Sequence, residues 1–226
     1  MNHQELAVLF EDNHLIAINK QSGMLVQGDE TGDEPLSETV KKFIKEKYGK
    51  PGAVFLGVVH RIDRPVSGVV VFARTSKSLE RMNALFKNRE TKKTYWALVG
   101  NKPAKAEDTL VHWLVKDEKK NKTTAYKREH PEGSRSELSY KIMGNQAGHY
   151  LLEVNPITGR PHQIRVQLAS MGCPIVGDLK YGFKEPNPDA SICLHARELS
   201  FVHPVKNEPI TITAPLPKNE LWNRFL

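Results

Sequence analysis

Cysteine is scarce in this sequence of 226 residues, which contains only Cys173 and Cys193 and has no Cys-x-x-Cys spacing. A disulfide framework and a cysteine-based metal motif are therefore not expected. The nine histidines show no His-Glu-x-x-His or other ligand spacing, so we expect no metal site. No apolar run approaches the roughly 20 residues that span a bilayer. Polar residues also interrupt the stretch 6–18, where a signal peptide needs a continuous apolar core. We expect a soluble, cytoplasmic protein that does not enter a membrane.

Positive charge is in excess, with 33 Lys and Arg against 26 Asp and Glu and a net charge of +7. Residues 87–128 hold twelve Lys and Arg against five acids, so this stretch alone carries a surplus as large as that of the whole chain. Charge gathered in one region is typical of contact with a polyanion. A solvated, lysine-rich surface would have the same composition. Charge alone leaves both interpretations open.

The first half of the chain predicts alternating strands and helices. Leu36, Val40 and Ile44 repeat at helical spacing, and Leu79 and Met82 begin a second such pattern after a capping Thr75 or Ser76. Short apolar runs rich in β-branched residues predict strands between the helices. The expected strands are residues 8–10, 15–18, 54–59, 69–72 and 95–99.

The second half is mostly strand-like and contains one expected helix, from Pro161 to about Met171. The lysine-rich segment 116–122 has the composition of a hairpin turn. Strands outnumber helices, and most connections are short enough for antiparallel pairing. We therefore expect an α+β fold, a single domain over residues 1–226 on a long mixed, mainly antiparallel sheet flanked by helices and loops. The expected strands here are residues 109–115, 136–143, 149–154, 192–202 and 209–213.

The segment from His60 to Gly68 is the most unusual part of the chain. It lies between two apolar runs, which predicts a loop held at the edge of the sheet or in a cleft. Asp63 stands in it between Arg61 and Arg64, and a guanidinium close to a carboxylate favours its ionised form, as a nucleophile or base requires. An ion-pair cluster in a tight surface turn would have the same residues. Composition alone favours that plainer interpretation.

The segment His60-Arg61-Ile62-Asp63-Arg64-Pro65-Val66-Ser67-Gly68 resembles the His-Arg-Leu-Asp-Arg-x-Thr-Ser-Gly signature of the RluA-type RNA pseudouridine synthases. Other segments resemble the family's motifs in the family's order and cover almost the whole chain. The departures from the family pattern remove no reactive group. The further matching segments are Val8–Asp12 with Asn19–Gly23, Lys92–Ala97, Gly159–Leu168, Pro174–Asp178 with Tyr181–Gly182, and Leu194–Ala196.

The resemblance implies the pseudouridine synthase fold and an isomerase that converts specific uridines in ribosomal or transfer RNA to pseudouridine. The reaction breaks the bond from ribose C1′ to uracil N1 and joins C1′ to C5. It involves no redox change and adds no group, so no cofactor is expected. The implied partner is an RNA stem-loop, and we expect a monomer. Because the core pattern begins by Val8, no separate N-terminal RNA-binding module is expected.

Three catalytic residues follow from the resemblance. Asp63 is implied as the catalytic carboxylate, which attacks the sugar, attacks the base or removes the C2′ proton. Tyr95 is implied as the active-site tyrosine, whose ring stacks on uracil and whose hydroxyl helps to remove the C5 proton. Its alternative is a strand tyrosine that packs in the core. Arg165 is implied as the arginine that pairs with Asp63; without the resemblance it would be a surface arginine.

Another set of residues is expected to bind RNA. Arg61 is the candidate for holding the target uridine in its flipped-out state, and its alternative is a simple ion pair with Asp63. Arg160, His162 and Gln163 lie at the N-terminal end of the expected helix, where free backbone N–H groups favour phosphate. We expect these three residues to contact RNA.

Three further residues are expected to shape the site. His60 and Arg64 support the loop, and Leu194 forms a wall of the uracil pocket or is an ordinary core leucine. Two other functions fit parts of the sequence. A non-catalytic RNA-binding protein of the same fold would be expected to lack Asp63 or Tyr95, and both are present. A glycosidase or nucleosidase usually needs a second carboxylate in a related motif, and none is found.

Overall fold

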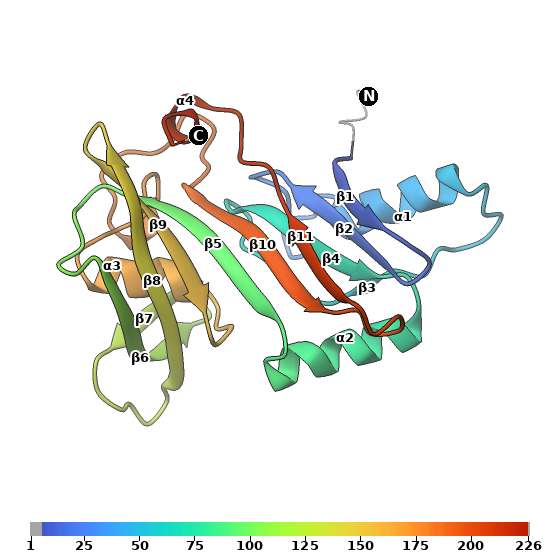
Figure 1. Cartoon of the computed structure of the whole chain (residues 1–226), viewed down its shortest axis with the longest axis horizontal. Helices are drawn as coiled ribbons and strands as arrows, with labels where there is room; N and C mark the ends of the chain where they lie inside the picture. The colour runs from blue at the N-terminus through green and yellow to red at the C-terminus, as the bar shows by residue number, and fades with distance from the viewer. Residues whose placement is uncertain (1–5, 226) are drawn as a thin grey trace. The chain divides into compact units, whose positions relative to one another are not determined.

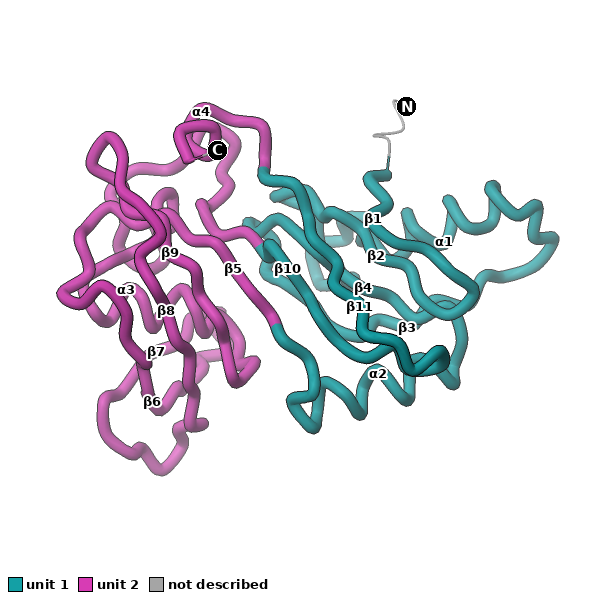
Figure 2. Tube along the Cα trace, viewed as in Figure 1, with its two compact units in different colours: residues 1–92, 196–216 teal, residues 93–195, 217–226 magenta. Residues whose placement is uncertain are grey.

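The computed structural model describes residues 6–225, whose helices and strands are labelled in Figure 1. The chain divides into two compact units, drawn in different colours in Figure 2. Unit 1 comprises residues 1–92 and 196–216, and unit 2 comprises residues 93–195 and 217–226. The expected α+β class with a mainly antiparallel sheet is confirmed. The single domain expected over residues 1–226 stays a prediction.

The sheet of unit 1 brings together strands from both ends of the chain. Its strands follow the order β1-β2-β4-β10, with β3 beside β4 and β11 beside β10 (Figure 1). The pairs β1–β2, β2–β4, β3–β4 and β10–β11 are antiparallel. The strands are β1 (Val8–Glu11), β2 (Leu15–Lys20), β3 (Gly57–Val58), β4 (Ser67–Ala73), β10 (Leu194–Val202, from residue 196 in unit 1) and β11 (Pro209–Thr213).

Both faces of the central strands of unit 1 are buried. Leu15 and Val71 belong to a core cluster with Met82, which lies on α2 (Ser76–Asn88). The alternate residues Ile16 and Phe72 point to the opposite face and are also fully buried. This explains why the strand sequences are continuous apolar runs. The other helix of unit 1, α1 (Leu36–Lys47), buries the apolar side of its own helical pattern.

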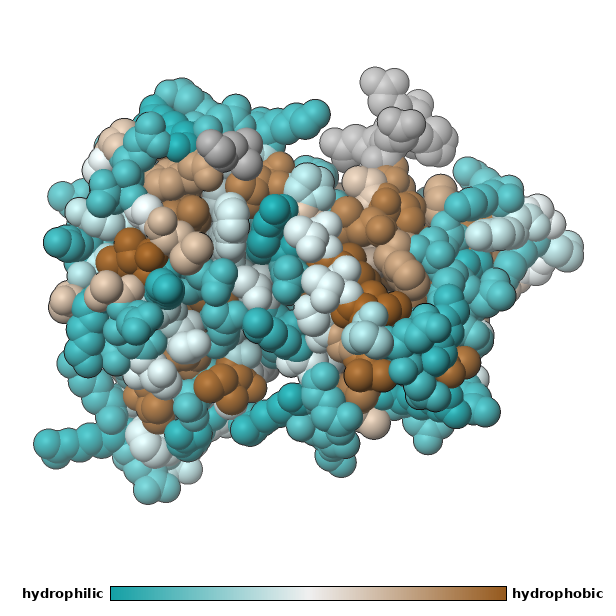
Figure 3. Space-filling view, in the orientation of Figure 1, coloured by the Kyte–Doolittle hydropathy of each residue, from teal (hydrophilic) through white to brown (hydrophobic). Residues whose placement is uncertain are grey.

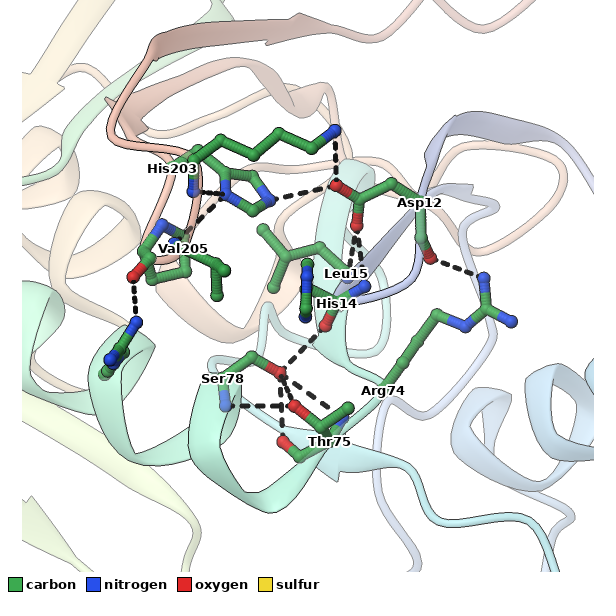
Figure 4. Close-up of polar contacts among 11 residues, drawn as sticks. Asp12, His14, Leu15, Arg74, Thr75, Ser78, His203 and Val205 are labelled. Atoms are coloured by element: carbon green, nitrogen blue, oxygen red, sulfur yellow. Dashed lines mark hydrogen bonds and ion pairs between the residues drawn. The ribbon is translucent and has the colours of Figure 1, made fainter.

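A polar cluster fastens the two hairpin turns of unit 1 to each other (Figure 4). Asp12, in the turn between β1 and β2, accepts the backbone N–H groups of His14 and Leu15, both at 2.8 Å. Its Oδ2 lies 3.0 Å from Nε2 of the buried His203 and 3.0 Å from Nζ of Lys206, both in the turn between β10 and β11. Asp12 therefore holds two connections that are far apart in the sequence.

Unit 2 is built on five antiparallel strands in the order β5-β9-β8-β6-β7. The helix α3 (Gln163–Ser170) packs on β6 and β7, where Val166 joins Leu114 and Tyr181 in a small core. A 3-10 turn (Leu179–Tyr181) and the short helix α4 (Glu220–Asn223) complete the unit. The strands are β5 (Lys92–Val99), β6 (Glu107–Asp117), β7 (Lys122–Tyr126), β8 (Ser134–Gln146) and β9 (His149–Pro156).

Most expected elements are confirmed, with two corrections. Residues 54–59 form a strand only at Gly57–Val58, because these two residues alone pair with β4, at its end. The expected helix begins at Gln163 and not at Pro161, because His162 has φ 53° and ψ 20°, a left-handed backbone that a right-handed helix cannot include. The strand β7, the 3-10 turn and α4 were not expected from the sequence.

The surface carries scattered apolar side chains. The face seen in Figure 3 is mostly hydrophilic, with separate apolar patches between polar residues. Tyr48, Phe55, Met143 and Leu179 are among the exposed large apolar residues. Within residues 6–225, no helix has the length and apolar character needed to span a membrane.

Candidate active site

Asp63 lies in the loop of unit 1 that joins β3 to β4. Its side chain is half-buried, and its neighbours Ile62 and Val66 are buried. The N–H of Val66 donates to the carbonyl of Asp63 at 3.0 Å and closes a tight turn. The apolar neighbours anchor the loop in the core, so the carboxylate is held at a defined place in a partly exposed position.

His60 fixes the start of this loop. Its Nε2 accepts the backbone N–H of Val71 in β4 at 3.0 Å, and its ring stacks on Phe86 of α2 with 4.9 Å between the ring centroids. Because Nε2 accepts, a neutral imidazole carries its proton on Nδ1. This geometry fits the expectation that His60 supports the loop.

Arg64 ties the loop to the turn after β2. Its Nε donates to the carbonyl of Gly23 at 3.0 Å, and the N–H of Gly23 donates to the carbonyl of Arg64 at 2.8 Å. Its Nη2 lies 2.7 Å from Oδ2 of Asp33. The two arginines beside Asp63 in the sequence therefore differ: Arg64 extends to Gly23 and Asp33, and Arg61 is exposed.

Lys20 is fully buried beneath the same loop and was assigned no function from the sequence. Its Nζ donates to the carbonyls of Gln21, Met24 and Arg64 at 2.9–3.1 Å, so three acceptors meet the three donors of an ammonium group. Burial lowers the pKa of Lys20 to about 7, and the nearby Asp63 opposes that shift. Lys20 thus joins the turn after β2 to the loop that carries Asp63.

Gly68 marks the end of the loop and allows two strands to approach closely. Its φ of +116° is unfavourable for other residues, and a Cβ atom at this position would lie 2.3 Å from the carbonyl oxygen of Ala196. Steric exclusion of a Cβ atom therefore explains why glycine occupies this position of the motif. It lets β4 run against β10 directly after the Asp63 turn.

Arg165 of unit 2 is held by an ion pair that the sequence did not predict. Its Nε lies 2.7 Å from Oδ2 of Asp178, and its Nη2 lies 2.9 Å from Oδ1. Both side chains are almost fully buried, and the guanidinium carbon lies 5.1 Å from the centre of the Tyr181 ring. The guanidinium is thus fixed in orientation by a carboxylate and an aromatic ring.

Tyr95 and Leu194 lie on strands of unit 2. Tyr95 is half-buried on β5, opposite Val154 of β9, and its neighbour Trp96 is half-buried as well. Leu194, at the start of β10, is buried. The buried position of Leu194 is compatible with a wall of the uracil pocket and with an ordinary core residue.

The start of α3 divides the three residues expected to contact RNA. Arg160 is exposed and His162 is half-buried. Gln163 is only 4% exposed: its Oε1 accepts from the Thr158 hydroxyl and the Arg160 N–H, and its Nε2 donates to the carbonyl of Glu137. The amide of Gln163 is therefore used inside the protein, which argues against the expected contact with RNA.

The structure gathers the expected residues into two groups. His60, Arg61, Asp63 and Arg64 share one loop of unit 1. In unit 2, the remaining residues lie on β5 and β10 and around α3. The expected pairing of Arg165 with Asp63 stays a prediction, because the two residues belong to different units.

Three buried residues that support these groups received no function from the sequence, namely Lys20, Asp178 and Tyr181. Each stands inside a segment that resembles a family motif, but the motif assigns it no chemistry. The available signal was a charged or polar residue close to an apolar run, as Lys20 follows residues 15–18 after one intervening residue. Together the described residues provide a partly exposed carboxylate, a half-buried tyrosine and a fixed guanidinium.

Comparison with known proteins identifies a family whose matched range contains these three candidate residues. The RNA pseudouridylate synthase family matches residues 14–170, a range that contains Asp63, Tyr95 and Arg165. The chain is 33% identical over 219 residues to the ribosomal large subunit pseudouridine synthase C of Vibrio cholerae serotype O1, covering 94% of this chain and 66% of that protein. It therefore spans slightly less than two thirds of this relative's length.

Two further relatives match over most of their length. The tRNA pseudouridine synthase C of Vibrio cholerae serotype O1 is 31% identical over 239 residues, covering 98% of this chain and 94% of that protein. The solved structure of human RNA Pseudouridylate Synthase Domain Containing 4 has a TM-score of 0.78 and 24% identity, covering 94% of this chain and 89% of that one, and shows the same fold. The chain thus belongs to the RluA-type family of RNA pseudouridine synthases, which are intramolecular isomerases.

Proposed function

We propose that this protein converts specific uridines in ribosomal or transfer RNA to pseudouridine, with Asp63 as the catalytic carboxylate. The observation that carries the proposal is the setting of Asp63: a half-buried carboxylate on a loop fixed by Lys20, His60 and Arg64. A reacting group must be held within a fraction of an ångström of its productive position. The contacts of these three residues tie the loop to Lys20 of β2, to Val71 of β4 and to Gly23 in the turn after β2.

The chemistry assigns a step to each catalytic residue. The C1′–N1 bond breaks, the uracil turns, and the C1′–C5 bond forms, after which C5 loses its proton and N1 gains one. Asp63 acts on the nucleotide to allow the first bond to break. Tyr95 stacks on uracil and assists removal of the C5 proton. Arg165 pairs with Asp63 and keeps the carboxylate ionised.

RNA binding is assigned to exposed cationic residues. Arg61 is exposed beside Asp63 and holds the target nucleotide out of its stack, a state that costs a few kcal/mol. Arg160 and His162 contact the RNA backbone before α3. The surplus of Lys and Arg in residues 87–128 neutralises further phosphates, so binding weakens as salt rises.

The relatives indicate two possible classes of RNA substrate. One matched relative is named for the large ribosomal subunit and the other for tRNA, so both classes are proposed as substrates of this chain. We also propose that the protein works as a monomer in the cytoplasm. Identification of the uridine requires the RNA itself, because recognition of folded RNA depends on loop shape.

The proposal is tested by incubating the purified protein, with a chelator present, with total ribosomal RNA and with total transfer RNA in separate reactions. Pseudouridine is then mapped by carbodiimide labelling and primer extension. We expect new pseudouridine at one site or a few sites in one of the two RNA classes. Retention of RNA without any conversion would contradict the proposal and would favour a non-catalytic RNA-binding protein.

A further inference from the structure

Tyr181 is a buried residue of unit 2 that contacts three other segments. Its hydroxyl oxygen accepts the backbone N–H of Thr123 in β7 at 2.9 Å. The same oxygen lies 2.7 Å from Nδ1 of His162, directly before α3. Its ring lies under the guanidinium of Arg165, on α3 itself. A single side chain therefore contacts β7, the residue before α3 and the arginine of the candidate site.

The hydrogen bonds through the hydroxyl have a defined direction. Burial raises the pKa of Tyr181, so the phenol stays protonated at neutral pH. Because its oxygen accepts from Thr123, the phenol can donate its own proton to Nδ1 of His162. The Thr123 hydroxyl also donates to the carbonyl of Pro161 at 3.2 Å. Residues 161 and 162 are thereby fastened to β7 through two side chains.

His162 has an unusual backbone conformation for its place before a helix. A left-handed φ of 53° is uncommon outside Gly, with Asn, Asp and His adopting it most often, and an N-cap residue usually has an extended backbone. The side chain of His162 makes no capping hydrogen bond to α3. The hydrogen bond with Tyr181 thus holds the His162 side chain where no capping bond does so.

The ring of Tyr181 acts on a different neighbour. The Arg165 guanidinium lies 5.1 Å from the ring centre, within the range of a cation–π contact, while Asp178 holds two of its nitrogens. Asp178 precedes the 3-10 turn that carries Tyr181, so both contacts to Arg165 come from residues 178–181. This short segment supplies both an ion pair and a ring contact to the guanidinium.

We propose that Tyr181 is a positioning residue with two separate effects: its ring orients Arg165 for catalysis, and its hydroxyl holds His162 in the conformation that contacts RNA. The inference rests on the proposed function, because it takes Arg165 and His162 as parts of the site. It goes beyond that function by linking the RNA contact before α3 to the catalytic arginine through one side chain.

The two effects are separated by two substitutions. Tyr181→Phe removes the hydroxyl and keeps the ring, so we expect KM for RNA to rise about fivefold while kcat changes by less than about twofold. Tyr181→Leu removes both, so we expect the same rise in KM together with a decrease in kcat of about tenfold. Tyr140→Phe is the matched control, because it removes a buried hydroxyl of the same unit that donates to the carbonyl of Lys105. We expect it to leave both constants unchanged.

His162 provides a second, independent comparison. Asn and Gly both accept a left-handed backbone, but only Asn keeps a polar atom near the position of Nδ1. We expect His162→Gly to raise KM and His162→Asn to restore much of the loss. Since the Tyr181 hydroxyl acts on RNA binding through His162, the double variant Tyr181→Phe with His162→Gly is expected to have the same KM as His162→Gly alone.

The experiment measures steady-state constants for each variant, normalised to the folded fraction at a temperature well below its unfolding midpoint. A purely structural effect would lower the folded fraction and leave the normalised constants at wild-type values, which would overturn the inference. Additive losses in the double variant, or equal effects of Tyr181→Phe and Tyr140→Phe, would also overturn it. A wild-type protein without activity would contradict the proposed function itself, and is recognised before any variant is compared.

Discussion

Arg165 and Asp178 form a buried ion pair in which two nitrogens of one side chain meet two oxygens of the other, at 2.7 and 2.9 Å. Asp178 is 1% exposed, so water does not compensate either charge if the partner is lost. The pair joins α3 to the segment after it and fixes the guanidinium that we assign to the active site. We therefore expect stability and activity to depend on the same contact.

Asp178→Asn is expected to impair both properties. The substitution keeps the shape of the side chain but removes the negative charge that holds two nitrogens of the buried Arg165 guanidinium, which costs about 3–5 kcal/mol of unfolding free energy. Urea unfolding measures the loss, and kcat is expected to decrease as well. The control Arg135→Lys changes an exposed ion pair with Glu137 and is expected to cost less than about 1 kcal/mol. Equal stability of the two variants would contradict this account.

Lys20→Met is expected to destabilise the loop that carries Asp63. The apolar side chain fills the space but leaves the carbonyls of Gln21, Met24 and Arg64 without their donor, at a cost of about 3 kcal/mol or more. Thermal unfolding and the rate of pseudouridine formation measure the effect. Lys45→Met, at an exposed position of α1, is the matched control. If Lys20→Met were as stable and as active as this control, Lys20 would not support the loop that carries Asp63.

Gly68→Ala is expected to prevent the close approach of β4 and β10. The added Cβ would lie 2.3 Å from the Ala196 carbonyl oxygen, which is backbone and cannot turn away. We expect a loss of more than about 3 kcal/mol, or failure to fold. Gly144→Ala adds the same atom where nothing lies within 4 Å and is expected to be tolerated. Similar unfolding midpoints for Gly68→Ala and Gly144→Ala would show that the fold does not require β4 and β10 to lie this close together.

The stabilisation by Asp12 is expected to depend on pH. Burial opposes ionisation, but the N–H groups of His14 and Leu15 and the ammonium of Lys206 outweigh it and lower the pKa of Asp12 from 3.8 to about 2. A lowered carboxyl pKa stabilises the fold at higher pH, and the effect is lost as pH falls from about 4 to about 2.

The variant Asp12→Asn tests this dependence in urea unfolding across that pH range. Near neutral pH it is expected to be about 2 kcal/mol less stable than the wild type, and the difference is expected to shrink as the pH falls. Glu34→Gln, which changes an exposed pair with Lys42, is the control and is expected to show a much smaller effect. A difference that stays constant with pH would contradict the assigned ionisation.

The elements that sequence predicts well are those specified by their own residues. In α2, the helix begins at Ser76, capped by Thr75, and Leu79 and Met82 face the core, as their spacing indicates. The strand β7 was missed because Lys122–Tyr126 lacks an apolar alternation, and its pairing with β6 defines it. Residues 54–59 have strand composition, but only two of them find a partner.

Within the candidate site, the loop was predictable and its supports were not. The segment that contains Asp63 lies between two apolar runs that had to be buried, so local sequence was enough to predict a loop there. The burial of Gln163 depends on acceptors and donors at Thr158 and Glu137, and glutamine is usually exposed. The partner of Arg165 lies 13 residues away at Asp178, and nothing in the spacing indicates that pairing.

The central claim is that Asp63 performs the reaction, and release of tritium from RNA labelled at uracil C5 tests it most directly, because that position loses its hydrogen when C1′ joins C5. The measurement compares the wild type with Asp63→Asn and with Asp29→Asn, a fully exposed control in the same unit. We predict that Asp63→Asn folds and binds RNA but releases tritium at least about a thousandfold more slowly, while the control matches the wild type. Release by Asp63→Asn at the wild-type rate would contradict the account.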